Sequence, residues 1–419
     1  MKRKLLTGML ALTVSLAQAQ QAETPEIPAP EHIVVAYYPS WGVYGKNYFV
    51  QDIPADKITH INYAFANVNA EGKCVLGDPW ADVQNGNLGV VGEGDKALKG
   101  NFAAIKQLKA KHPSLKVLIS VGGWTFSKYF SVAARTPESR KAFVDSCVNM
   151  FIHGQYDGVD PQYGQGVFDG IDIDWEYPVV MGNAGNIVDP SDKQNYTLLM
   201  EDFREALNRA SLQTGQEYQL TIAASASPTI LREHMETANL ANVLDFINLM
   251  TYDYHGSWDA TTNHHSSLYA SDREPSGDIN SVDNTVQTVL DLGVDPRQIV
   301  VGIPFYGRSY KEVESGNNGL YQKTTGGGPG TLGEAGVLKY ADVLKLEMNP
   351  NYRKFRDRQT RTTWLYSKKD GIFVAYDDPD TIKDKVKYIR KLGLGGAMFW
   401  ELSQDDGSLL NVLDAGLNP

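Results

Sequence analysis

The chain has 419 residues, of which 42% are hydrophobic and 21% are charged, and its formal net charge at pH 7 is −11. This length and composition predict a globular protein with a sizeable core. The acidic balance disfavours nucleic acid and anionic lipid as partners and suits a neutral ligand.

The first nineteen residues have the pattern of a secretory signal peptide. Residues 1–4 read MKRK, residues 5–16 are largely apolar, and residues 17–19 read AQA, a typical cleavage site. The apolar stretch is too short to span a bilayer, and no later stretch approaches that length. We therefore expect an exported, soluble protein, extracellular or periplasmic, with a flexible leader over residues 20–31 that is rich in Glu, Pro and Ala.

Apolar, β-branched segments recur along the chain, with segments of helical period between several of them. The predicted strands span 33–38, 58–66, 116–121, 167–175, 218–224, 243–250, 299–305 and 395–400. The predicted helices span 95–111, 137–151, 192–212 and 279–292. Such near-continuous apolar strands are typical of a parallel sheet covered by helices. The pattern predicts an α/β fold and favours a barrel, in which functional residues lie at the carboxyl ends of the strands.

One of these strands carries a row of acids. Residues 169–176 read DGIDIDWE. Because side chains alternate across a strand, Asp172, Asp174 and Glu176 share one face at intervals of about 6.6 Å, whereas Asp169 falls out of the alternation. Crowded carboxylates repel one another unless protons or partners intervene, and their pKa values shift. The apolar flanks favour a buried strand over a solvated acidic edge, so the row indicates acid catalysis.

Four further motifs stand at the ends of predicted strands. Residues 120–124 read SVGGW, 250–253 read MTYD, 306–308 read YGR and 396–401 read GAMFWE. Together with the acid run, which fits DxxDxDxE at every position, they resemble glycoside hydrolase family 18, the family of the chitinases. The motifs follow the order of that family and cover the chain from about residue 32 to its end.

The resemblance implies an eight-stranded β/α (TIM) barrel with a small α+β insertion domain between strands seven and eight. We expect the barrel over residues 32–309 and 376–419 and the insertion over 310–375. The alternation of strands and helices breaks in this interval, and its aromatic residues are too numerous for a disordered linker.

The resemblance also assigns catalytic roles. Glu176 matches the general acid, whose pKa must be raised if it is to donate a proton near neutral pH. Family 18 departs from ordinary retaining glycosidases, because the oxygen of the substrate's own N-acetyl group attacks the anomeric carbon. Asp174 would then hold the acetamido N–H, Asp172 would share a proton with Asp174, and Asp169 would be structural. Tyr252 would hold the acetamido oxygen.

Other motif positions match sugar-binding residues of the family. Trp400 matches the floor of the pocket, where an indole face stacks on a pyranose ring, and Ser120 is expected to hydrogen-bond Asp172. The predicted substrate-binding residues are Tyr37, Phe65, Trp80, Ser120, Gly122, Gly123, Trp124, Thr125, Tyr177, Met250, Thr251, Asp253, Trp258, Tyr306, Arg308 and Trp400.

The expected partners are chitin and chito-oligosaccharides, and we expect a monomer without metal or cofactor. The pair His264-His265 has no spacing that resembles a zinc site, and we expect both rings to be solvated in a loop. Cys147 falls in a helical segment and is expected to be an unpaired core residue, a bridge to Cys74 being the alternative.

The sequence leaves two alternative functions. A chitinase-like lectin on the same fold would have its acid replaced, whereas Glu176, Asp174 and Tyr252 are all present. An endo-β-N-acetylglucosaminidase acting on N-glycans would carry the same acids, but the insertion and the tryptophans at the strand ends favour a long homopolymer. A metal-dependent polysaccharide deacetylase would need a His/Asp ligand cluster that the sequence does not present.

Overall fold

The computed structural model describes residues 32–418. The predicted signal peptide and leader lie outside the described residues. No helix within the described part of the chain is both long and apolar enough to cross a membrane.

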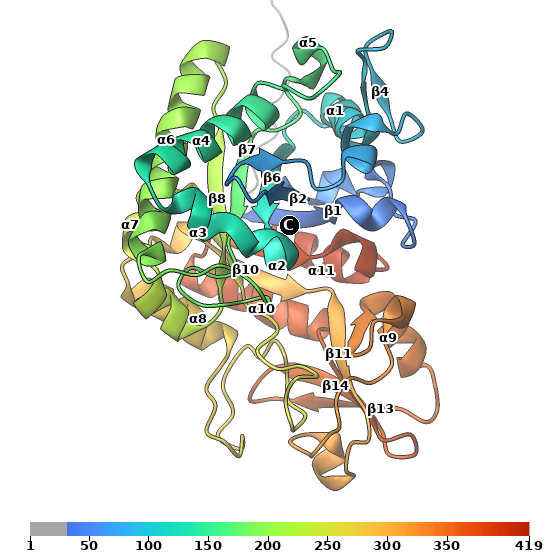
Figure 1. Cartoon of the computed structure of the whole chain (residues 1–419). Helices are drawn as coiled ribbons and strands as arrows, with labels where there is room; N and C mark the ends of the chain where they lie inside the picture. The colour runs from blue at the N-terminus through green and yellow to red at the C-terminus, as the bar shows by residue number, and fades with distance from the viewer. Residues whose placement is uncertain (1–31, 419) are drawn as a thin grey trace, which may run out of the picture. The chain divides into compact units, whose positions relative to one another are not determined.

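Eight parallel strands close into a barrel (Figure 1). Closure comes from the pairing of β1 with both β2 and β16, so that Val35 is opposite His60 on one side and Met398 on the other. The strands are β1 (Ile33–Pro39), β2 (His60–Val68), β6 (Lys116–Gly122), β7 (Gly170–Asp174), β8 (Gln219–Ser225), β9 (Phe246–Met250), β10 (Ile299–Pro304) and β16 (Gly396–Trp400). The predicted barrel is confirmed.

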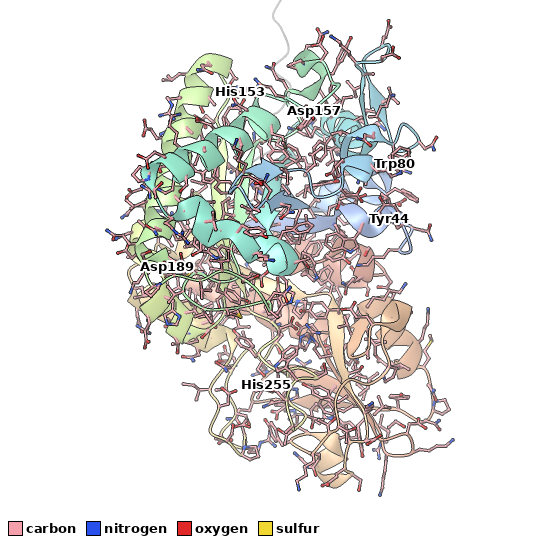
Figure 2. All side chains as sticks on the ribbon, in the orientation of Figure 1. Tyr44, Trp80, His153, Asp157, Asp189 and His255 are labelled. Carbon is pink, nitrogen blue, oxygen red and sulfur yellow. A yellow bond between two sulfur atoms is a disulfide. The ribbon has the colours of Figure 1, made fainter. Side chains whose placement is uncertain are left out.

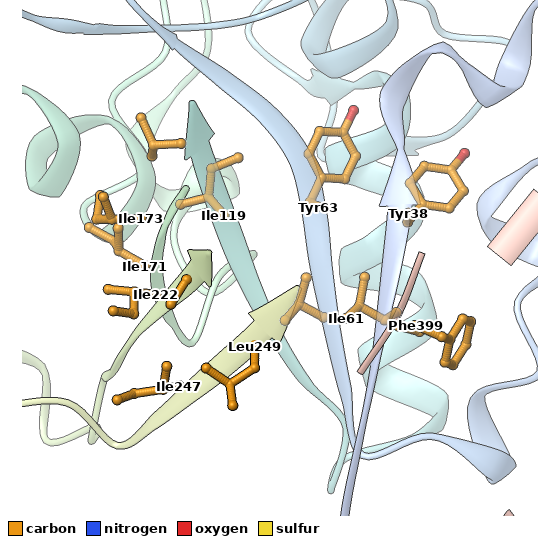
Figure 3. Packing of buried hydrophobic residues seen from close by; sticks show 14 of the residues in the cluster. Tyr38, Ile61, Tyr63, Ile119, Ile171, Ile173, Ile222, Ile247, Leu249 and Phe399 are labelled. Atoms are coloured by element: carbon orange, nitrogen blue, oxygen red, sulfur yellow. The ribbon is translucent and has the colours of Figure 1, made fainter. Parts of the chain in front are cut away.

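Alternating side chains on these strands divide the core into two layers. Val34, Ala36 and Tyr38 of β1 belong to the large cluster between the barrel and its helices, part of which Figure 3 shows. Val35 and Tyr37 belong to a smaller cluster, which also contains residues of β2, β9, β10 and β16. The period of two along each strand produces this division, and it decides which side chains reach the interior of the barrel.

Helices connect the strands and cover the barrel (Figure 1). The longer ones are α1 (Gly100–Lys111), α4 (Pro137–Cys147), α6 (Asp192–Thr214), α8 (Val282–Asp291), α10 (Pro379–Leu392) and α11 (Ser408–Leu417), and the shorter ones are α2 (Gly123–Phe126), α3 (Phe130–Ala134), α5 (Pro161–Gly164) and α7 (Thr237–Ala241). Two begin later than predicted. α1 starts at Gly100 because β5 (Leu98–Lys99) pairs with β4 (Val90–Val91) just before it, and α8 starts after Ser281, whose side chain caps it.

A second, antiparallel sheet interrupts the barrel between its seventh and eighth strands. Its order is β12 (Val337–Lys339), β11 (Tyr306–Tyr310), β15 (Ile372–Tyr376), β14 (Thr362–Ser367) and β13 (Arg353–Asp357), with α9 (Tyr340–Glu347) following β12. Trp364, Tyr366 and Phe373 help to form its own small core. The expected insertion is therefore present, and its exact residue boundaries stay a prediction.

The expectation for the cysteines was wrong. Cys74 and Cys147 form a disulfide with a Cα–Cα distance of 5.1 Å. The short strand β3 (Cys74–Val75) pairs antiparallel with the end of β2, and the backbone N–H of Cys74 donates to Ser146 Oγ at 2.9 Å. These contacts bring Cys74 to the last turn of α4, a long-range approach that a helical pattern around Cys147 does not reveal.

Replacing both cysteines with serine should lower the free energy of unfolding by about 4 kcal/mol, because the bridge joins residues 73 apart in sequence and restricts the unfolded chain. Urea unfolding of the two proteins measures the difference. Ser146→Ala, which removes the local hydrogen bond and keeps the bridge, should cost about 1 kcal/mol. Equal losses in the two variants would contradict the assignment of the stabilisation to the bridge.

Candidate active site

β7 carries the acid row into the barrel. Asp172 and Asp174 are 0% and 3% exposed, and Glu176, two residues beyond the end of the strand, is 8% exposed. Ile171 and Ile173, on the opposite face of the strand, pack in the outer core that Figure 3 shows. The alternation predicted from the sequence therefore separates the acids from the apolar residues as expected.

Asp172 is surrounded by neutral hydrogen-bond donors. Its Oδ2 accepts from Tyr37 Oη at 2.9 Å and from Ser120 Oγ at 2.7 Å. Its Oδ1 accepts from Thr221 Oγ1 at 2.6 Å and from Asn248 Nδ2 at 3.3 Å. Burial raises the pKa of Asp172, and these four hydrogen bonds oppose the increase. The expected bond from Ser120 is present, whereas Thr221 and Asn248 were not predicted.

Asp174 and Glu176 form a buried pair of carboxyl groups with raised pKa values. The pKa of Asp174 is raised first by burial and then by the charges of Glu176 and Asp172. Burial likewise raises the pKa of Glu176 to about 7, and the charge of Asp253 adds to the increase. Because two neighbouring buried carboxyl groups cannot both ionise easily, the environment favours a protonated form of the pair.

The backbone of Glu176 is held by two residues that sequence reasoning missed. Its N–H donates to Ser127 Oγ at 2.9 Å, and its carbonyl accepts from Asn186 Nδ2 at 3.0 Å. Ser127 in turn donates to the carbonyl of Asp174. The peptide bond that follows Glu176 is cis. Sequence order gave no signal for either residue, since both lie in connecting segments.

Both predicted glycines are required by close approach. Gly122 and Gly123 have φ angles of 112° and 74°, values that L side chains rarely adopt. A Cβ atom at Gly122 would lie 2.3 Å from the carbonyl oxygen of Asp174, and one at Gly123 would lie 2.6 Å from the Phe65 ring. The end of β6 can therefore pack against the acid strand and the aromatic floor only without side chains.

Aromatic rings line the barrel next to the acids. Trp400 has ring-centroid distances of 5.3 Å to Tyr37 and 5.7 Å to Phe65, and it stacks on Phe65. Trp41, which was not predicted, stacks on the same Phe65 at 6.1 Å and is 37% exposed. Met250 and Tyr252 pack against the same inner cluster. These rings offer apolar faces beside the carboxyl row.

An ion pair joins the barrel to the second sheet near the acids. Arg308 of β11 donates through Nε to Asp253 Oδ1 at 2.7 Å and through Nη2 to Oδ2 at 2.5 Å. Its guanidinium lies 5.0 Å from the centroid of Trp258 and 5.3 Å from that of Tyr306. Although burial acts in the opposite direction, the charge and hydrogen bonds of Arg308 hold the pKa of Asp253 well below its usual range.

The expectation of two solvated histidines was wrong. His264 and His265 are 2% and 1% exposed. His265 Nδ1 lies 3.5 Å from Asp253 Oδ1, and the ring packs on Tyr306 at 5.3 Å. Burial lowers the pKa of His265, although Asp253 acts in the opposite direction. The loop after β9 packs against the second sheet, where His264 contacts Trp364 and His265 contacts Tyr306. Both histidines are therefore buried although they belong to a loop.

The remaining predicted residues divide by exposure. Tyr177 directly follows Glu176, and burial together with the charge of Glu176 raises the pKa of its hydroxyl. Trp80, Trp124 and Trp258 are 54%, 51% and 59% exposed, and Thr125 is exposed as well. Thr251 is fully buried and donates to the carbonyl of Gly302 at 2.7 Å, so its hydroxyl is used within the barrel.

Comparison with known proteins identifies the family. The model for glycosyl hydrolases family 18 matches residues 33–405. The chain belongs to this family, and it is a glycoside hydrolase. Chitinase A1 of Niallia circulans is 38% identical over 436 aligned residues, which cover 95% of this chain and 60% of that protein. The chain thus spans less than two thirds of this relative's length.

The chain is also similar to solved structures of chitinases with the same fold. The catalytic domain of the psychrophilic chitinase B from Arthrobacter TAD20 is 34% identical with a TM-score of 0.85, and the match covers 93% of this chain and 95% of that one. A group II chitinase catalytic domain from Ostrinia furnacalis, solved as a mutant in complex with penta-N-acetylchitooctaose, is 30% identical with a TM-score of 0.79 and coverage of 92% and 96%.

Arg308→Met should lower the free energy of unfolding by about 2 kcal/mol, because Asp253 then keeps a partly buried charge without its guanidinium partner. Adding Asp253→Asn should restore part of the loss, since the uncompensated charge disappears. Urea unfolding measures both changes. As a control, Arg297→Met breaks the exposed pair with Asp295 and should leave stability nearly unchanged. A double variant less stable than Arg308→Met alone would contradict this reasoning.

Proposed function

We propose that this chain is an exported chitinase that hydrolyses the β-1,4 bonds between N-acetylglucosamine units with retention of configuration. Glu176 is its general acid and base, and the N-acetyl group of the substrate is the nucleophile. The observation that carries the proposal is the row of three buried carboxyl groups that ends in Glu176 at the carboxyl end of β7. The family membership and the chitinases among its relatives support it.

Glu176 has the protonation behaviour that an acid catalyst needs. With a pKa raised to about 7, it is substantially protonated near neutral pH and can donate to a glycosidic oxygen. After the leaving group departs, the same carboxylate can take a proton from water. Its backbone is fixed on both sides by Ser127 and Asn186, so the point from which the side chain extends is held in place.

Asp174 is poorly suited to be an enzyme nucleophile. It is 3% exposed, and burial together with the charges of Glu176 and Asp172 favours its protonated form. A protonated carboxyl group attacks carbon weakly, but its carbonyl oxygen can accept from the acetamido N–H. When the proton of Asp174 passes to Asp172, whose pKa is also raised, the carboxylate left on Asp174 can stabilise the positive charge that develops on the acetamido group. This environment supports attack by the acetamido oxygen of the substrate, the mode known for the family.

Tyr252 is free to orient that acetamido oxygen. Within residues 32–418 its hydroxyl has one hydrogen-bond partner, the sulfur of Met398 at 3.8 Å, which is a weak acceptor. Trp400, stacked on Phe65, supplies an apolar face for the sugar ring at the same site. The two side chains therefore complement an N-acetylated pyranose.

The exposed tryptophans support a long substrate. Trp124 and Trp258 are both more than half exposed. Because large aromatic side chains contribute most of the apolar surface that a binding interface buries, these two exposed rings are available to a ligand. Trp124 follows β6 and Trp258 follows β9, so both stand at the carboxyl end of the barrel. A polymer of several sugar units can cover both rings at once, which favours chitin over the compact core of an N-glycan.

Two observations support export. Residues 1–19 have the composition of a signal peptide. The disulfide between Cys74 and Cys147 suits an oxidising compartment, because disulfides rarely persist in the cytosol. Chitin, an insoluble polymer outside the cell, is accessible to an exported enzyme.

Glu176→Gln should lower kcat on chito-oligosaccharides at least about a hundredfold, the scale of a lost general acid, while oligosaccharide binding persists. Steady-state hydrolysis and calorimetric titration measure the two effects. Glu138→Gln makes the same chemical change on an exposed helix and should retain full activity. Binding without turnover in the unmodified protein would indicate a lectin instead.

The pH profile gives an independent readout of the same residue. A general acid must be protonated to act, so kcat/KM should fall as the pH rises through about 7, where Glu176 loses its proton. The residual activity of Glu176→Gln should lack this limb. An alkaline limb that persists unchanged in the variant would assign it to another group.

Substrate assistance predicts which bonds are cut in partly acetylated chitosan. A deacetylated unit offers no acetamido oxygen, so the intramolecular attack, worth several kcal/mol, is lost there. Every new reducing end should therefore carry an N-acetylated sugar, and fully deacetylated chitosan should resist hydrolysis. Sequencing of the products by mass spectrometry measures the identity of the ends. Frequent deacetylated reducing ends would overturn the mechanism.

A further inference from the structure

Asp82 is a buried carboxyl group outside the acid row. We infer that Asp82 is a positioning residue that fixes the exposed rings of Trp80 and Tyr44, so that they can contact the outer units of a long saccharide. The inference depends on the proposed function, because that function assigns the exposed rings to the substrate. Asp82 itself is 1% exposed, so the proposed role is to position other residues and not to contact the substrate.

Asp82 is bonded to the barrel through a neutral network. It lies in η4 (Trp80–Gln84), a single turn in the long connection between β2 and α1. Tyr63 of β2 donates through its hydroxyl to Asp82 Oδ1 at 2.5 Å. Asn101 of α1 donates through Nδ2 to the same hydroxyl at 3.0 Å. One buried carboxyl group thus ties the connection to a barrel strand and, through Tyr63, to a helix.

The other side of Asp82 leads to the surface. The backbone N–H of Asp78 donates to Asp82 Oδ2 at 3.1 Å. Asp78 uses its own carboxylate to accept from the backbone N–H of Ala81 at 3.1 Å and from the hydroxyl of Tyr44 at 2.7 Å. The chain of hydrogen bonds therefore runs from Tyr63 in the barrel wall to Tyr44, with Trp80 between the two aspartates in sequence.

Both rings at the end of this chain are accessible. Trp80 is 54% exposed and Tyr44 is 46% exposed, and Figure 2 shows them on the same side of the molecule. η1 (Ser40–Val43), which directly precedes Tyr44, contacts η4. η1 follows β1, and η4 belongs to the connection after β2. Connections after strands form the functional face of a β/α barrel, so the two rings belong to the same face as the acids.

The approach to η4 is equally constrained. A Cβ atom at Gly77 would lie 2.0 Å from the carbonyl oxygen of Phe65, so the chain crosses β2 in contact, immediately before Asp78. Phe65 also stacks on Trp400 in the candidate pocket. The connection that carries Trp80 is therefore packed against the strand that carries the pocket's aromatic floor.

The carboxyl group is costly where it stands, and this argues for a specific task. No basic side chain within residues 32–418 forms an ion pair with Asp82, and burial, with the charge of Asp78, raises its pKa to about 7. A hydrophobic residue of similar volume often stabilises a protein at such a position. What a hydrophobic residue cannot do is receive Tyr63 and the Asp78 backbone at the same time, and these two contacts set the direction of η4.

The test compares long and short substrates in Asp82→Asn and Tyr63→Phe. Asp82→Asn loses the acceptor for the Asp78 backbone N–H, and Tyr63→Phe loses both hydrogen bonds of the Tyr63 hydroxyl, to Asp82 and from Asn101. Each variant should raise KM for a hexamer of N-acetylglucosamine about fivefold, the effect of weakened contact with one aromatic ring. The value of kcat, and kcat/KM for a disaccharide glycoside with a fluorescent leaving group, should stay within about twofold. As a control, Asp357→Asn replaces another buried carboxyl group (4% exposed), which lies in the second sheet. This variant should change neither KM for the hexamer nor kcat/KM for the disaccharide glycoside.

A mutant cycle identifies the route of the effect. If Asp82 acts through Trp80 and Tyr44, then adding Asp82→Asn to a variant that already carries Trp80→Ala and Tyr44→Ala should raise the hexamer KM no further. Additive effects of Asp82→Asn and the two ring substitutions would overturn the inference. So would an unchanged hexamer KM in Asp82→Asn, or an equal loss of kcat/KM on long and short substrates.

Hydrogen exchange keeps this test separate from the proposed function. Amides of residues 77–86 should exchange at least about tenfold faster in Asp82→Asn than in the unmodified protein, while those of β7 keep their protection. This readout needs no substrate. If the unmodified protein failed to cleave chito-oligosaccharides, the proposed function would fall, and unchanged exchange over residues 77–86 would overturn the positioning role on its own.

Discussion

Closure of the barrel determines the environment of the acid strand β7. Once β7 is paired on both sides by β6 and β8, its alternating side chains must point either to the helices or to the interior. Asp172 and Asp174 are on the inner face, away from bulk water, and Asp172 meets only hydroxyl and amide donors there. The charge of the buried acid row is therefore reduced by protonation of its carboxyl groups and not by pairing with basic side chains among residues 32–418. The raised pKa values and the proposed division of labour among the three acids follow from this constraint.

The second sheet contributes to the site through one charged contact. Arg308, at the start of that sheet, pairs with Asp253, just beyond the end of β9. Asp253 stays ionised because of this pair, and its charge in turn helps to raise the pKa of Glu176. The arginine also packs against Trp258. One residue of the second sheet thus influences both the protonation of Glu176 and the placement of an exposed ring.

Much of this arrangement was predictable because it depends on short-range patterns. The period of two in residues 169–176 placed the acids, and the glycines after Ser120 indicated close approach. Thr221 and Asn248 were missed, although each is a polar residue within an apolar strand and Thr221 is in register with Asp172. A search for polar residues at the same level of neighbouring strands would have found Thr221. His264 and His265 were misjudged for a different reason, because their burial depends on packing between β9 and a sheet formed much later in the chain.

The disulfide was misjudged for the same reason, and its position explains how a long connection can hold an exposed ring in place. The chain between β2 and α1 has little regular structure, so its ordering costs conformational entropy. It is held near its start by Cys74, bonded to the end of α4, and further along by Asp82, bonded to β2 itself. Because the connection is fixed at two points, Trp80 has less conformational freedom before a ligand binds. The entropic cost of ordering it on binding is therefore smaller. An enzyme that acts on a stiff polymer, as proposed for this chain, would benefit from rings that are already in place, and the two anchors supply that order far from the acids.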